Sequence, residues 1–121
     1  MKSHAAVAAV LLGQERSLAD AEAFVAGVLA DIETSGLDDC EKALMRFVDR
    51  VNRESPSIGP EDIARLHHAG WSDEAIYYAI TVCALFNFYN RWIDASGVHA
   101  LSEEAHRQGG KRSAAMGYVR K

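Results

Sequence analysis

Residues 72–97 read SDEAIYYAITVCALFNFYNRWIDASG, and this stretch decides the fold. Its first two thirds, residues 75–88, are apolar on almost every side, and a helix of that kind is normally buried among other helices. Ser72 suits the N-cap, the two acidic residues after it suit the positive end of the helix dipole, and Gly97 suits the position just past the end. The sequence therefore predicts a central helix that other helices surround.

The last third of this helix carries polar groups along one side. Cys83, Asn87, Asn90 and Asp94 follow i, i+4, i+7 and i+11 spacing, so they share one face of the helix. Arg91 lies beside them. We call these five residues the polar seam: Cys83, Asn87, Asn90, Arg91 and Asp94. Two interpretations remain open. The seam either makes interhelical hydrogen bonds and an Arg91–Asp94 pair that fix packing or oligomer register, or it forms the wall of a polar pocket.

In the rest of the chain, apolar residues recur at helical spacing, and capping and helix-stop residues separate the segments, as in shorter helices. We expect them over about residues 3–12, 18–32, 38–53, 60–68 and 102–107, with Gly109-Gly110 breaking the last one. No stretch alternates with period two over the length of a strand. The predicted fold is an all-α bundle of about five or six helices, forming one domain over residues 1–121.

Charge and composition exclude several classes of protein. The chain has 49% hydrophobic and 25% charged residues, as globular proteins do, and its net charge of −4 gives no general attraction to nucleic acid. The segment 107–121 is locally basic and is predicted to be a solvated or frayed tail, with phosphate or RNA binding as the alternative. The central stretch is too polar near its end for a membrane span.

The cysteines and histidines offer little catalytic chemistry by themselves. Cys40 and Cys83 form no Cys-x-x-Cys, which suits a reducing cytoplasm and excludes a disulfide framework. Cys83, in the middle of the apolar helix, is predicted to be a packing residue and not a reactive thiol. No histidines are spaced as metal ligands, so neither a metal nor a cofactor is predicted. With no signal peptide recognised, we expect a cytoplasmic protein.

Two longer segments resemble a known family. Residues 66–76 (LHHAGWSDEAI) and 84–98 (ALFNFYNRWIDASGV) resemble the carboxymuconolactone decarboxylase/AhpD-like superfamily, within it the alkylhydroperoxidase (peroxidase-related) branch. Residues 3–7 and 11–13 match the stretch that follows the cysteine motif of that branch. The resemblance therefore covers nearly the whole chain.

The resemblance implies an AhpD-like helical bundle that assembles into trimers or hexamers. It also implies that the protein reduces peroxides with the help of a thiol reductant. The catalytic parts of the family are a Cys-x-x-Cys, a His four residues after the second Cys, and an upstream Glu. His4 matches that His, which would place both cysteines and the Glu before Met1. Neither Cys40 nor Cys83 matches a motif cysteine. Either the chain is truncated, as the lack of a cap before residues 3–12 suggests, or it is a non-catalytic relative.

Three functions follow from these observations. The first is an AhpD-like alkylhydroperoxidase-family protein, inactive as given because its redox cysteines are missing. The second is a non-catalytic helical oligomer that binds a small ligand or serves as a scaffold through the polar seam. The third is a cofactor-free decarboxylase or isomerase with His4 as general base, although Arg91 alone could hold a carboxylate substrate.

Overall fold

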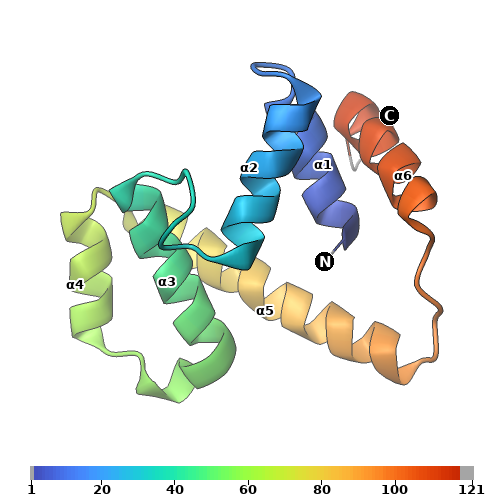
Figure 1. The fold of residues 1–121 in the computed structure, drawn as a ribbon. Coiled ribbons are helices and arrows are strands. Elements are labelled where there is room, and N and C mark those ends of the chain that lie inside the picture. Colours follow the sequence, from blue (N-terminus) through green and yellow to red (C-terminus); the bar gives the residue numbers. More distant parts are fainter. Residues whose placement is uncertain (1, 118–121) are drawn as a thin grey trace. The chain divides into compact units, whose positions relative to one another are not determined.

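The structure, a computed structural model, describes residues 2–117, with side chains from His4 onward (Figure 1). This part of the chain is all-helical and contains no strand, which confirms the all-α part of the prediction. The helices are α1 (Lys2–Leu12), α2 (Leu18–Ala30), α3 (Asp39–Glu54), the short 3₁₀ helix η1 (Ser55–Ser57), α4 (Pro60–His68), α5 (Asp73–Ala95) and α6 (Glu103–Met116). No described helix has the length and apolar character that crossing a membrane requires.

These elements fall into two compact units. Of the described residues, one unit comprises those up to Gly36 together with those from His99 onward, and the other comprises Leu37–Val98. We call them the terminal unit and the central unit and describe each by itself. Whether residues 1–121 act as one domain stays a prediction.

Local side chains begin most helices where the sequence predicts. The Oγ atoms of Ser17, Ser72 and Ser102 each accept a hydrogen bond from the backbone N–H three residues later, as N-caps do. Asp38 and Glu41 form a reciprocal capping box at the start of α3.

The helix α4 also ends as predicted. Gly70 has a φ of +101°, and the N–H of Trp71 donates to the carbonyl of Leu66 at 3.0 Å. This is the left-handed stop that glycine makes without steric cost. The indole Nε1 of Trp71 then donates to the carbonyl oxygen of Cys40 at 2.9 Å, which ties the turn before α5 to the start of α3.

The core of the central unit lies where three helices meet. Phe47 of α3, Leu66 of α4 and Ile76 of α5 are each at most 5% exposed, and the partly buried hydrophobic residues around them come from the same helices and the turns between them. The apolar residues that give residues 38–53 their helical periodicity therefore face the core. The removal of these side chains from water is the main favourable term in the stability of this unit.

The central helix departs from the prediction. Within α5 only Ile76 and Cys83 are buried, so the helices of the central unit do not surround α5 on all sides in the way that the sequence predicts. Nine large apolar side chains of α5 stay exposed: Tyr77, Tyr78, Val82, Leu85, Phe86, Phe88, Tyr89, Trp92 and Ile93. The reason is that α3 and α4 each offer one apolar stripe, which covers one side of α5.

The last helix is a second correction. The sequence predicts a helix over residues 102–107 and a break at Gly109-Gly110, but α6 continues through both glycines to Met116. Gly110 is buried, and a Cβ atom there would lie 3.0 Å from the backbone carbon of Ala6 in α1. The glycine therefore lets α6 approach α1 closely, and this packing offsets its low helix propensity.

The same finding changes the predicted basic tail. Residues 107–116 are not a frayed end but the body of α6, packed along α1. Tyr118, Arg120 and Lys121, the rest of the predicted tail, lie outside the described residues.

The helix α2 ends two residues earlier than predicted, at Ala30 in place of Ile32. The carboxylate of Asp31 accepts hydrogen bonds from the backbone N–H of Glu33 at 3.0 Å and from the hydroxyl of Thr34 at 2.8 Å. An aspartate that bonds its own following backbone in this way favours a turn over another helical residue.

Candidate functional site

The polar seam is centred on Asn87. Its side-chain Nδ2 donates to the Oδ1 of Asn52 in α3 at 2.7 Å and to the carbonyl oxygen of Cys83 at 3.0 Å. The Oδ1 of Asn87 accepts a hydrogen bond from Arg91 at 2.6 Å. Asn87 therefore links α5 to α3, which is the interhelical bonding that one of the two interpretations predicts.

The remaining seam residues do not gather around Asn87. Asn90 and Asp94 are exposed, and their side chains make no hydrogen bond or ion pair with any other described residue. The expected pair between Arg91 and Asp94 is not formed among these residues, because Arg91 turns back along the helix to the carbonyl and side chain of Asn87. Whether the outer part of the seam serves a pocket or a subunit contact stays a prediction.

The two cysteines are free and lie in different settings. Cys83 is buried, and its Sγ lies 3.8 Å from the carbonyl oxygen of Val48, which is the position of a thiol that donates a weak hydrogen bond to the backbone. Cys40 is half-buried in the first turn of α3. Neither is half of a Cys-x-x-Cys, so neither supplies the attacking and resolving pair of a dithiol catalyst.

His4, the predicted catalytic histidine, lies in the first turn of α1 and has an exposed side chain. It belongs to the terminal unit, whereas the polar seam belongs to the central unit. Among the described residues, no three histidine, cysteine, aspartate or glutamate side chains are placed to hold a metal ion together.

A charge cluster around one buried carboxylate, which sequence analysis missed, lies in the central unit. Asp62 of α4 is 8% exposed, and its carboxylate accepts hydrogen bonds from Arg50 of α3, from Arg65 of α4 and from the backbone N–H of Gly59. The Gly59 N–H and the two guanidinium groups lower the pKa of the Asp62 carboxyl below its ordinary 3.8, although burial acts in the opposite direction. This cluster fixes α4 on α3.

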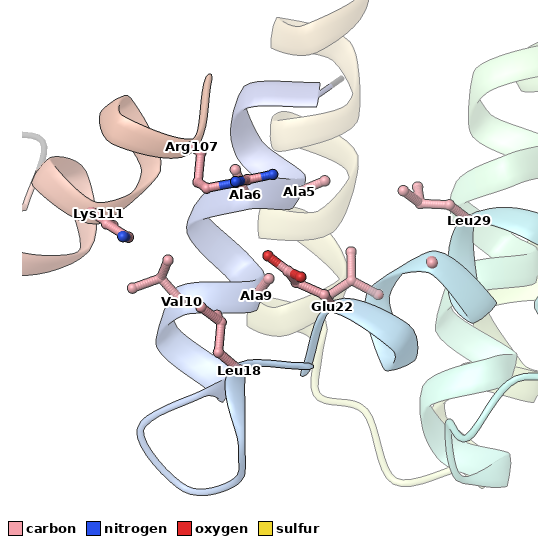
Figure 2. A pocket seen from close by; sticks show the side chains of 11 residues that line it. Ala5, Ala6, Ala9, Val10, Leu18, Glu22, Leu29, Arg107 and Lys111 are labelled. Atoms are coloured by element: carbon pink, nitrogen blue, oxygen red, sulfur yellow. The ribbon is translucent and has the colours of Figure 1, made fainter. Parts of the chain in front are cut away.

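Sequence analysis also missed a groove in the terminal unit. It is lined by alanines of α1, by Glu22 and Leu29 of α2, and by Arg107 and Lys111 of α6 (Figure 2). The signal in the sequence is an Ala-rich helix together with two cations at i, i+4 spacing. The helix break that the sequence predicts at Gly109-Gly110 would separate Arg107 from Lys111 and so conceals their common face.

Comparisons of the chain with models of protein families, with curated proteins and with solved structures find no match. The AhpD-like resemblance therefore stays a prediction.

Proposed function

We propose that the chain is an AhpD-like alkylhydroperoxidase-family protein whose 121 residues lack the thiol chemistry of the family. The observation that carries this proposal is the resemblance of residues 66–76 and 84–98, which the structure places in α4, α5 and the turns that follow them. The all-helical architecture is compatible with it. The family reaction would be thiol-dependent reduction of an organic hydroperoxide, with antioxidant defence as its role.

That reaction needs two thiols at one place. A thiolate attacks a peroxide oxygen, the O–O bond breaks, an alcohol leaves, and a sulfenic acid forms. A second thiol then closes a disulfide and releases water, and a thiol reductant returns two electrons. A buried Cys83 bonded to the backbone and a half-buried Cys40 are poor substitutes for such a pair. We therefore expect the 121 residues to reduce no hydroperoxide catalytically.

The test restores the missing motif. We expect an N-terminal Cys-x-x-Cys extension, with its second Cys directly before Met1, to oxidise dithiothreitol with cumene hydroperoxide at least tenfold faster than the same extension with both cysteines changed to serine. His4 is then four residues after the second Cys, and His4→Phe in the extended chain should remove most of this gain. A folded, extended chain with no more activity than its serine control would overturn the proposal.

A second candidate function, a self-associating scaffold or binding protein, is favoured by the surface of α5. At 100° per residue, the nine exposed apolar side chains all fall within one half of the helix circumference, opposite the half that carries Ile76, Cys83 and Asn87. We call this half the apolar face of α5. Its exposed fractions reach 69% for Tyr77, 61% for Phe88 and 60% for Trp92.

The size of the apolar face suits a contact between copies of the chain. With fully exposed aromatic side chains near 200 Å² each, the nine residues present about 900 Å², close to the roughly 800 Å² per partner of a stable interface. Patches of this size are uncommon on monomers. The resemblance predicts trimers or hexamers, and light scattering at micromolar concentration tests this directly. A stable monomer would contradict this candidate function.

A further inference from the structure

The groove of the terminal unit is formed because two helices pack on the same third helix. Both α2 and α6 pack against α1, but in the described part of the chain they make no close backbone approach to each other. Ala5, Ala6 and Ala9 of α1 are short enough to leave the space between them open (Figure 2). Two adjoining hollows of about 230 Å³ and 340 Å³ result, and both are lined by Ala5, Ala6, Glu22, Leu29 and Arg107. Lys111 lines only the first hollow, and Glu103 lines only the second.

The walls of this groove are apolar except at a few places. Val10, Leu18, Val25 and Leu29 face the first hollow together with the alanines. Volumes near 300 Å³ lie at the lower end for small-molecule sites, which are mostly apolar with a few polar groups that orient the ligand. A linear ligand of about ten non-hydrogen atoms matches this size.

The charged groups of the first hollow favour an anion. Arg107 and Lys111 project from one face of α6, and Glu22 lies on the opposite wall, so the cations outnumber the carboxylate (Figure 2). Within the described residues Lys111 has no ion-pair partner, and Arg107 has only Glu104, at 3.7 Å on the exposed side of α6. Among these residues Lys111 therefore lacks a close counter-charge, and the one ion pair of Arg107 is long.

The second hollow contains an unsatisfied polar atom. His106 lines it, and its Nδ1 is buried without a hydrogen-bond partner among the described residues. A buried nitrogen in this state costs free energy, which a partner in the adjoining space would recover. A polar group of a bound molecule is such a partner.

We propose that the groove between α1, α2 and α6 binds a small amphiphile with an aliphatic body and a carboxylate head. The carboxylate lies at Arg107 and Lys111, where charge-assisted hydrogen bonds are available. The aliphatic body lies over the alanines of α1. The groove belongs to the terminal unit, whereas the apolar face of α5 belongs to the central unit.

The experiment uses octanoate as the probe and 1-octanol as its neutral counterpart, titrated into the full chain and followed by amide chemical shifts. A ligand of this size should bind with a dissociation constant on the order of 0.1–1 mM. Octanol should bind at least tenfold more weakly, because it lacks the charge. The shifts should concentrate on α1, α2 and α6.

Matched variants separate the site from general surface binding. Arg107→Gln and Lys111→Gln should each weaken octanoate binding about five- to tenfold and leave octanol unchanged. Arg112→Gln removes the same charge from the same helix but lines neither hollow, so it should have no effect. Ala5→Leu should fill the groove and weaken both probes.

Three outcomes would overturn the proposal: equal affinity for octanoate and octanol, equal effects of Arg112→Gln and Lys111→Gln, or shifts concentrated on α5. The chain with Leu85→Glu on α5 provides an independent check. Loss of octanoate binding in this variant would show that the apolar face of α5, and not the groove, takes up the probe.

Discussion

At the scale of single residues, Asp62 is the charged residue that is buried in the described part of the chain. Its carboxylate connects Arg50 of α3 with Arg65 of α4 and also accepts the Gly59 N–H at 3.0 Å. Removal of one partner from such a cluster leaves the other groups without their charge-assisted bonds, which costs more than the loss of an exposed pair. The exposed pair of Asp49 and Arg53 on α3 provides the comparison.

We therefore expect Asp62→Asn to lower the thermal midpoint of the chain by at least about 5 °C. Asp49→Asn, which breaks the exposed pair, should shift it by no more than about 2 °C. Circular dichroism melts at pH 7 measure both. Equal shifts for the two variants would show that the buried cluster does not hold α4 on α3.

The stability contributed by Asp62 should also depend on pH. Because the folded state has the lower pKa, the unfolded state takes up this proton first as the pH falls. The contribution is therefore complete above the ordinary value of 3.8 and is lost as the pH falls through the lower pKa of the folded state. Urea unfolding from pH 6 down to pH 2.5 measures the free energy of unfolding of wild type and of Asp62→Asn. The difference between the two free energies should shrink only below about pH 4. If this difference already disappears near pH 5.5, the pKa of Asp62 in the folded state is not lowered.

At the scale of elements, the contact between α1 and α6 depends on one glycine of an adjacent pair. A Cβ atom on Gly110 would meet the backbone carbon and the Cβ of Ala6, both at 3.0 Å, whereas a Cβ atom on Gly109 would have nothing within 4 Å. The two positions have the same helix propensity, so any difference between them comes from packing. They therefore form a natural matched pair.

Gly109→Ala should stabilise the chain by about 0.5–1 kcal/mol, because it removes the entropic cost of glycine in a helix. Gly110→Ala should instead destabilise it by about 1–2 kcal/mol, because α6 must move away from α1 by a few tenths of an ångström. Chemical denaturation of the two variants measures the difference. Stabilisation by both would contradict the close approach at Gly110.

At the scale of the whole molecule, the apolar face of α5 is a large exposed apolar surface, and its burial in a contact between copies of the chain would be favourable. A glutamate at its middle would be buried without a counter-charge in an oligomer, so Leu85→Glu should weaken self-association about 100-fold or more. Leu101→Glu makes the same substitution at an exposed leucine outside α5. Sedimentation over a concentration series should find the first variant shifted to monomer and the second assembled as wild type. Equal behaviour of the two would remove α5 from the contact.

The sequence by itself determined the class of the fold and the positions of most helix ends. Caps such as Ser72 and stops such as Gly70 act within one helical turn, so neighbouring residues suffice to predict them. The link between Asn87 and Asn52 was predicted only as an interhelical bond without a named partner, because side-chain spacing gives a face of a helix but not the residue opposite it.

Only the tertiary structure decided where α6 runs, which side of α5 is covered, and that a groove exists. Gly109 and Gly110 have the same local propensity, and only the approach of Ala6 distinguishes them. The periodicity of α5 does not say how many helices are available to cover it, and the charge of Asp62 gives no sign that Arg50 lies beside it. The physical reason is the same in each case. These features are contacts between residues far apart in the chain, and local helix propensities and capping do not depend on such contacts.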